Sequence, residues 1–301
     1  MEGLFPNWIM SGKEKIKTIN NNLRHKNCPL CSSNKIYKEG EIEYDSPLYF
    51  STHEIFLTLT PELWKCNDCK SGFIQNVIPE EVAAHLYKVG AAENRWPNTP
   101  EMAKTTKVFK VLDSLYNKNK NVLDIGCNTG ELLDLAKAKG CTTSGVEYCL
   151  NSLQYIKGKG HTGYSRLDEV EDKFDVITAF DLFEHIYDVA SLLSTCYDKL
   201  STDGRLVFLT GDISCVSGRF TGANWWYLKY PEHIVFPSKE FFSFNKKYLI
   251  DKWVHTYAYV GFKNPFSKLL RSSLIGVMKG KYTGLPSIGP DHILVVLKKN
   301  D

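Results

Sequence analysis

The segment from Asn121 to Gly130 constrains the fold more than any other part of the chain. A short apolar run, residues 122–125, ends in a glycine turn, and a helical pattern of leucines and alanines follows at once. Strand, tight turn and helix in this order are typical of a nucleotide-binding α/β unit. Gly126 and Gly130 let the backbone approach a ligand, and Asn128 tolerates the left-handed conformation of such a turn. We therefore predict a ligand at the start of the following helix, where free amides and the helix dipole favour it.

The next predicted strand, Thr142–Val146, ends in Glu147. An acidic residue about twenty positions beyond the loop accepts hydrogen bonds from the hydroxyls of a bound ribose. A dinucleotide loop would carry its glycines as G-x-G-x-x-G, whereas this chain has G-x-x-x-G. The pattern therefore predicts a nucleoside-containing ligand and matches a dinucleotide site poorly.

Asp124-x-Gly126-x-x-x-Gly130 followed by Glu147 resembles the first motifs of class I S-adenosylmethionine-dependent methyltransferases. The resemblance runs from about Glu101 to Lys298 and includes an F-D-x-I segment and a following E-H pair. It implies an α/β fold with a seven-stranded Rossmann-like methyltransferase sheet and S-adenosyl-L-methionine as cofactor; a Rossmann-like domain for another nucleotide is the alternative. The cofactor contacts that it implies are Asp124, Gly126, Cys127, Asn128, Gly130, Glu147, Tyr148, Phe180, Asp181 and Trp96.

Four of the nine cysteines form two C-x-x-C pairs, with 34 residues between the pairs. Two such knuckles can direct four thiolates at one ion, which gives a closed tetrahedral site with a structural role. We predict Zn²⁺ in a small N-terminal zinc ribbon, whose intervening stretches 35–44 and 48–59 form the β ribbon. Unligated redox thiols are one alternative. Iron is another, although the glycine usual after the second cysteine of each such knuckle is replaced. The predicted ligands are Cys28, Cys31, Cys66 and Cys69.

Length and composition predict two domains, one large and one small, in a chain of 301 residues. A net charge of +3 makes nucleic acid an unlikely partner, and no apolar run is long enough for a membrane span. An odd cysteine count with C-x-x-C pairs favours a reducing, cytoplasmic location; the oligomeric state stays open. We expect a tail at 1–26, the ribbon at 27–75, a linker helix and cofactor lid at 76–100, and the methyltransferase domain at 101–301. Insertions that shape the acceptor site are expected at 211–237 and 261–290.

Two histidines compete for the role of general base. His233 lies in the first insertion, and His185 follows the fourth predicted strand close to the expected cofactor. Histidine suits the removal of a hydroxyl proton near neutral pH. The loss of activity on the acid side of the pH profile, its acid limb, should therefore follow a group that titrates near neutrality. We prefer His233, with Glu232 or Glu184 as a group that orients an imidazole or binds a sugar hydroxyl.

Aromatic residues precede His233 and predict an acceptor pocket. Together with the ribbon, the W-W-Y-x-x-x-P-E-H-I string resembles methyltransferases of deoxysugar and surface-glycan pathways. This implies a nucleotide-linked or glycan-precursor sugar as acceptor. We expect methylation at a hydroxyl and not at carbon, because sugar C-methyltransferases with this ribbon usually carry a further domain after the last strand, which we do not predict here. RNA base methylation and a non-catalytic cofactor-binding regulator are the competing readings. The same rings could instead form a small core. In the linker, Tyr87 and Trp96 could cap the cofactor or could simply pack against the protein. The predicted substrate-binding residues are Trp225, Trp226, Tyr227 and Tyr230.

Overall fold

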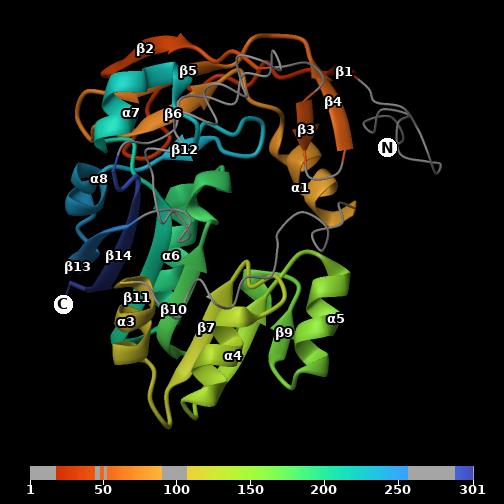
Figure 1. Cartoon of the computed structure of the whole chain (residues 1–301), viewed down its shortest axis with the longest axis vertical. Helices are drawn as coiled ribbons and strands as arrows, with labels where there is room; N and C mark the ends of the chain where they lie inside the picture. Colours follow the sequence, from red (N-terminus) through yellow and green to blue (C-terminus); the bar gives the residue numbers. More distant parts are fainter. Residues whose placement is uncertain (1–17, 45–47, 51–52, 90–106, 257–288, 301) are drawn as a thin grey trace.

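A computed structural model describes residues 18–44, 48–50, 53–89, 107–256 and 289–300 (Figure 1). Its centre is a seven-stranded sheet in the order β13-β14-β11-β10-β7-β8-β9. Five neighbouring strands run parallel, while β14 is antiparallel to both β11 and β13. The predicted seven-stranded α/β sheet is confirmed. Its strands are β7 (Asn121–Ile125), β8 (Thr142–Val146), β9 (Thr162–Tyr164), β10 (Phe174–Phe180), β11 (Leu200–Gly211), β13 (Tyr248–Thr256) and β14 (His292–Lys299).

Helices cover both faces of this sheet because its strands are apolar on both sides. On one face α3 packs against a cluster that includes Val122, Val176 and Val207. On the other, α6 and α8 pack against a cluster that includes Phe183 and Phe208. The helices of this domain are α3 (Lys107–Leu115), α4 (Glu131–Ala138), α5 (Leu150–Gly158), α6 (Val189–Lys199) and α8 (Lys239–Phe244), with 3₁₀ turns η2 (Leu167–Glu169) and η3 (Phe183–His185).

The cysteine-rich module forms a four-stranded sheet in the order β12-β6-β5-β2. Three strands come from the module: β2 (Ile36–Glu41), β5 (Glu62–Cys66) and β6 (Gly72–Gln75). The fourth, β12 (Val235–Phe236), comes from the first insertion of the large domain and pairs antiparallel with β6. In Figure 1 β12 lies among the ribbon strands although it is far away in the sequence. The insertion also contains α7 (Val216–Thr221) and the turn η4 (Gly222–Asn224).

A three-stranded sheet, β1-β4-β3, replaces part of the expected ribbon. The stretch 48–59 forms β3 (Leu48–Phe50) and β4 (His53–Leu57), which pair with each other and not with β2. Within the expected tail, β1 (Thr18–Ile19) pairs with β4. Asn21 is fully buried there and donates hydrogen bonds to two backbone carbonyls. Buried polar groups of this kind need such partners, so these residues are part of the folded module. The second insertion, apart from its last two residues, lies outside the described residues, as does Trp96.

One hydrophobic core extends through the ribbon and the large domain. It includes Leu63 and Phe73 of the ribbon, Trp225 and Phe236 of the insertion, and Phe208 of the central sheet. The helix α1 (Glu80–Val89) joins the two parts where the linker helix was expected. Among the described residues no helix is long and apolar enough to cross a bilayer.

Candidate active site

The glycine loop between β7 and α4 has the conformation that the sequence predicts. Gly126, Asn128 and Gly130 all have positive φ, at 73°, 45° and 81°. The amide of Gly126 donates to the carbonyl of Val146, and the amide of Gly130 donates to the carbonyl of Cys127. The loop therefore turns tightly against β8, and the N-terminus of α4 lies at the carboxyl edge of the sheet.

Glu147 follows β8 at the same edge. Its carboxylate accepts hydrogen bonds from the amides of Asn128 and Cys149, both at 2.9 Å. Partial burial raises its pKa, against the effect of these amide donors. Each carboxylate oxygen can accept more than one hydrogen bond, so the group keeps capacity for ribose hydroxyls. The residues present therefore fit the nucleoside end of S-adenosylmethionine.

The other predicted cofactor residues differ in their exposure to solvent. Asp124 is buried and accepts a 2.6 Å hydrogen bond from Thr178, and burial raises its pKa to about 7. Its carboxyl group is therefore enclosed in the sheet, where it links β7 to β10. Cys127 is also buried, whereas Tyr148 is 61% exposed beside Glu147. Phe180, at the end of β10, is half-buried.

Asp181 begins the loop that follows β10, and its φ of 47° is in the left-handed region. This conformation is uncommon for a residue other than glycine and often occurs where a loop is held for function. Its side chain is exposed to solvent, although protein atoms lie close to its carboxylate. This crowding and the nearby Glu184 carboxylate raise the pKa of Asp181 to about 6.

His233 is fully enclosed at this edge, with 2% of its surface exposed. Its Nδ1 lies 2.8 Å from the carbonyl oxygen of Tyr227. A carbonyl can only accept, so we assign the proton to Nδ1, which leaves the Nε2 lone pair as the basic site. Burial, followed by the charges of His185 and Lys229, lowers the pKa of His233 well below 6.5. The imidazole is therefore neutral near pH 7, and the acid limb expected near neutrality must move to lower pH.

His185 lies beside His233, with ring centroids 4.8 Å apart and the rings nearly perpendicular. Its Nδ1 lies 2.9 Å from the carbonyl oxygen of Glu232 and 2.8 Å from the hydroxyl of Tyr87. The same reasoning places the proton on Nδ1 and leaves Nε2 as an acceptor. Tyr87 of the linker helix thus contacts this histidine. Glu232 contributes its backbone carbonyl here, and its side chain is buried.

Glu184 connects the elements that meet at the site. Its side chain is fully buried and accepts hydrogen bonds from Thr210 of β11, at 2.8 Å, and from the Tyr227 hydroxyl. Its backbone carbonyl accepts from the amide of Ile234 at 2.8 Å. Its Oε1 lies 4.0 Å from Nε2 of His233. A carboxylate at this distance stabilises an imidazolium that forms during proton transfer.

The last strand supplies a dyad that the sequence reasoning missed. Asp291 accepts from the indole of Trp226 at 2.9 Å and contacts Nδ1 of His292 at 2.9 Å. The ring of His292 packs on Tyr227, with centroids 4.5 Å apart. Because β14 is antiparallel, its first residues lie at the carboxyl edge of β11. An Asp-His pair at the start of an antiparallel last strand is the signal that could have identified them.

The aromatic residues before His233 are mostly core. Trp225, Tyr227 and Tyr230 are buried, with 2%, 3% and 6% of their surface exposed. Their burial corresponds to the alternative of a small core inside the insertion. Trp226 is half-buried, and the ammonium of Lys229 lies 5.1 Å from its ring centroid. Of the four predicted acceptor-binding rings, Trp226 keeps the most open surface for a ligand.

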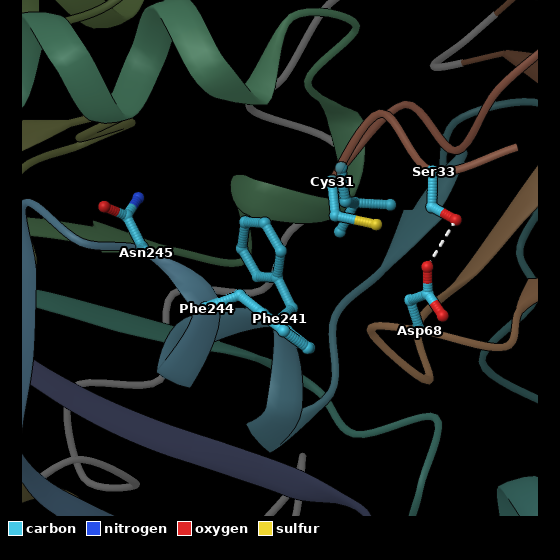
Figure 2. A pocket seen from close by; sticks show the side chains of 7 residues that line it. Cys31, Ser33, Asp68, Phe241, Phe244 and Asn245 are labelled. Atoms are coloured by element: carbon cyan, nitrogen blue, oxygen red, sulfur yellow. Dashed lines mark hydrogen bonds between the residues drawn. The ribbon is translucent and has the colours of Figure 1, made fainter.

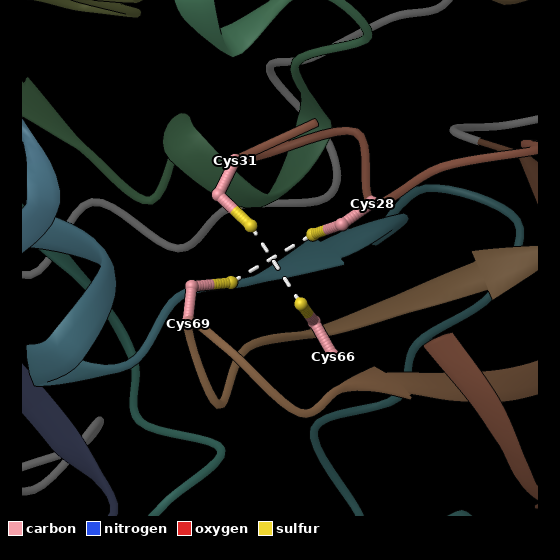
Figure 3. A group of neighbouring side chains, drawn as sticks. All are labelled: Cys28, Cys31, Cys66 and Cys69. Carbon is pink, nitrogen blue, oxygen red and sulfur yellow. Dashed lines mark hydrogen bonds between the residues drawn. The ribbon is translucent and has the colours of Figure 1, made fainter. Parts of the chain in front are cut away.

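The four ribbon cysteines converge on one point (Figure 3). Their sulfurs are 3.7 Å apart for Cys28 and Cys69, and 3.6 Å apart for Cys31 and Cys66. Tetrahedral zinc with bonds of about 2.3 Å requires sulfur–sulfur distances of about 3.8 Å. The donor set therefore fits one zinc ion, and none of the nine cysteines is in a disulfide.

A second group of possible metal ligands coincides with the candidate active site. One ligand atom each from Glu184, His185 and His233 lies within 4.8 Å of the others. The same three side chains could hold a cation or handle a proton, and both uses need a neutral imidazole.

Comparisons with known proteins agree on one class of domain. A family described as "Methyltransferase domain" matches residues 102–243, slightly under half of the chain. Ubiquinone biosynthesis O-methyltransferases of Pseudomonas putida and Pseudomonas entomophila are 28% identical over 102 residues, which is 30% of this chain. The matched region spans only 44% of the length of these relatives.

Solved structures of low sequence identity are also similar. A SAM-dependent methyltransferase from Archaeoglobus fulgidus is 19% identical, with a TM-score of 0.45 over 67% of this chain and 95% of the other. An S-adenosylmethionine-dependent methyltransferase from Mesorhizobium loti is 15% identical, with a TM-score of 0.44 over 66% of this chain and all of the other.

Proposed function

We infer that the chain is an S-adenosylmethionine-dependent methyltransferase, and we propose that its acceptor is a hydroxyl of a small polar molecule. The methyltransferase-domain match and the curated relatives support the enzyme class. The relatives' names specify O-methylation, which supports oxygen as the acceptor atom. A sugar, nucleotide-linked or part of a glycan precursor, is the acceptor we propose. The sequence resemblance to glycan-pathway enzymes and the partly open Trp226 ring support it.

The cofactor, when bound, supplies an activated methyl group, so the protein has to position the acceptor and remove its proton. We propose that Glu147 and the glycine loop hold the nucleoside, and that Tyr148 offers an exposed ring beside it. Asp181 and Trp226 come from the same carboxyl edge, where ligands of open α/β sheets bind. The exposed part of Asp181 would contact the acceptor side.

His233 is the general base in this proposal, and its geometry is the observation that carries it. Its neutral ring holds the Nδ1 proton against a carbonyl and presents Nε2 toward Glu184. When the acceptor hydroxyl loses its proton to Nε2, the ring becomes an imidazolium. Glu184, held by two hydroxyl donors, then stabilises the positive charge. His185 and Glu232 complete the wall beside this base.

Turnover with a panel of acceptors tests the proposal. The purified protein is incubated with S-adenosylmethionine and, separately, nucleotide sugars, simple glycosides, phenols and a transcribed RNA, and release of S-adenosylhomocysteine is measured. We expect turnover with a sugar hydroxyl, and a loss of about 10²–10⁴-fold in His233→Ala with nearly unchanged S-adenosylhomocysteine affinity. Turnover with RNA or phenols alone would refute the sugar acceptor. A His233 variant with wild-type turnover would refute the base and make His185 the next candidate.

We also propose that the four-cysteine site holds one structural Zn²⁺. The sulfur–sulfur distances support this, and a closed thiolate site leaves no position for substrate. The division into a ribbon at 27–75, a linker at 76–100 and a catalytic domain from 101 belongs to the same proposal. Nine thiols without a disulfide suit a reducing compartment such as the cytoplasm.

A further inference from the structure

The segment that follows His233 is held by the cysteine-rich module and not by the sheet of the large domain. The pairs Val235–Phe73 and Phe236–Gly72 join β12 to β6. The amide of Ile74 donates to the carbonyl of Ile234 at 2.8 Å. His233 therefore lies two residues before a strand whose register is fixed by the ribbon.

Ser238 connects this strand directly to the second cysteine knuckle, the turn that carries Cys66 and Cys69; the first knuckle carries Cys28 and Cys31. Its hydroxyl donates to the carbonyl of Cys69, and its amide donates to Oγ of Ser71 at 3.2 Å. The same hydroxyl accepts from the amide of Phe241 and so caps α8. Ser238 has no exposed surface. A single buried side chain thus ties the metal-binding turn to the helix and strand on either side of it.

The helix α8 also lies against the first knuckle. Leu30 of the knuckle and Phe241 of the helix belong to one hydrophobic cluster, and residues of both elements, including Cys31, line a hollow of about 300 Å³ (Figure 2). Asp68 of the second knuckle accepts a 2.8 Å hydrogen bond from Ser33 across the same hollow. The 234–241 segment is therefore in contact with both knuckles.

On its other side the same segment is tied to the candidate active site. The amide of Ile234 donates to the carbonyl of Glu184 at 2.8 Å. The hydroxyl of Tyr230 donates to the carbonyl of Asn76, at the end of β6, at 2.9 Å. Residues 230–238 thus bridge the ribbon and the histidine pair. By contrast, the glycine loop and Glu147 form hydrogen bonds within the large domain, to one another and to β8, β9, α5 and their flanking residues.

We propose that the four-cysteine module positions His233 for the acceptor step, and that Ser238 and the β6–β12 pair transmit this control. The catalytic part of this inference rests on the function proposed above. Metal bound at the knuckles orders residues 66–71. This turn then positions β6 and Ser238, and β6 and Ser238 together position the backbone that carries His233. Loss of the metal should then displace the base while cofactor binding is retained. Ser238 is a positioning residue, since its contacts are with the knuckle and α8.

Metal depletion of the full chain tests the coupling without any acceptor. The protein is treated with a zinc chelator, its metal content is measured, and amide hydrogen exchange is followed by peptide. We expect exchange in residues 230–238 to rise at least about tenfold as this segment opens locally. Exchange in residues 121–147 and S-adenosylhomocysteine affinity should stay within about twofold, and zinc should restore protection. Unchanged protection in 230–238 would overturn the proposal. Loss of cofactor binding together with that protection would also overturn it, because the metal would then support the whole fold.

A pair of serine variants separates positioning from general stability. Ser238→Ala removes the link to the knuckle, whereas Ser243→Ala removes an exposed hydroxyl of α8 whose hydrogen bond goes to Lys239 of the same helix. We expect Ser238→Ala to keep its zinc and its cofactor affinity but to lose roughly 10–100-fold in kcat, as misplaced groups do. Ser243→Ala should match the wild type. Wild-type kcat in Ser238→Ala, with an active wild-type control, would refute the positioning role. If no acceptor is turned over by any form, the exchange experiment alone decides the coupling, and only the proposed function fails.

Discussion

Replacement of Glu184 by glutamine tests the charge arrangement around the base with little change in shape. The wild-type carboxylate accepts from the hydroxyls of Thr210 and Tyr227. A glutamine can keep both contacts, because its oxygen accepts from one hydroxyl and its amide donates to the other. The variant therefore removes one negative charge 4.0 Å from Nε2 of His233 and leaves the packing intact.

The size of the effect follows from that distance. At an effective dielectric constant of about 20, two unit charges 4.0 Å apart interact by about 4 kcal/mol. A proton that is half transferred in the transition state would use about half of this energy. This is about 2 kcal/mol, so we expect kcat to fall by roughly 30-fold in Glu184→Gln. Affinity for S-adenosylhomocysteine should change little, since Glu184 bonds to Thr210, Tyr227 and Ile234, and not to the glycine loop or Glu147.

The pH dependence provides a second readout. Burial already lowers the pKa of His233 well below 6.5, so the acid limb of kcat should lie below that pH in the wild type. Removal of the carboxylate disfavours the imidazolium further, and the limb should move to still lower pH. Asp212→Asn is the matched control, because this buried carboxylate follows β11, the strand that carries Thr210, and accepts hydrogen bonds from Ser214 instead. A Glu184→Gln enzyme with wild-type kcat and an unchanged pH profile would refute the reasoning.

Three further predictions concern cofactor, metal and stability. Glu147→Ala should weaken S-adenosylhomocysteine binding by roughly 10–150-fold in calorimetry, because ribose contacts are lost; a folded variant with unchanged affinity would exclude this role. Elemental analysis should find about one zinc per chain, and Cys66→Ser should reduce it strongly; metal-free protein with freely titrating thiols would contradict the site. Burial raises the pKa of Asp124 from 3.8 to about 7, so the wild type should lose stability as pH rises from about 4 to 7, where only the unfolded chain is ionised. Asp124→Asn should lack this loss. Its Tm minus that of the wild type should therefore be larger at pH 8 than at pH 4.5, by on the order of 5 °C. If this Tm difference is the same at both pH values, the pKa of the Asp124 carboxyl group is not raised.

The sequence predicted the central sheet well because its signals are local. Each parallel strand is an apolar run bounded by turn residues, and the positive φ values of Gly126 and Asn128 follow from residue type. Ser238 caps α8 for the same reason, because serine is a common N-cap residue. The cysteine spacing likewise predicted which four side chains converge.

Pairings between distant segments could not be predicted in this way. The strand β12 has two residues and no alternation, so nothing local indicates that it completes the ribbon. Aromatic composition could not distinguish a stacking surface from a small core, and the burial of Trp225 and Tyr230 depends on the ribbon that covers them. Asp291 and His292 were missed because an insertion separates them from the other site residues, and only the antiparallel direction of β14 brings them to the same edge.

The pairing of Ser238 with Ser71 spans 167 residues and has a consequence for biosynthesis. A ribosome makes all four cysteines before it makes any strand of the central sheet, so the knuckles can capture zinc early. The open edge of β6 must then wait for β12 while the remaining chain is translated. An unpaired apolar edge attracts other chains, and pairings of such long sequence separation form slowly. The nascent chain should therefore be most prone to aggregation between synthesis of the second knuckle and emergence of residue 236, and chaperone binding should be strongest in that interval.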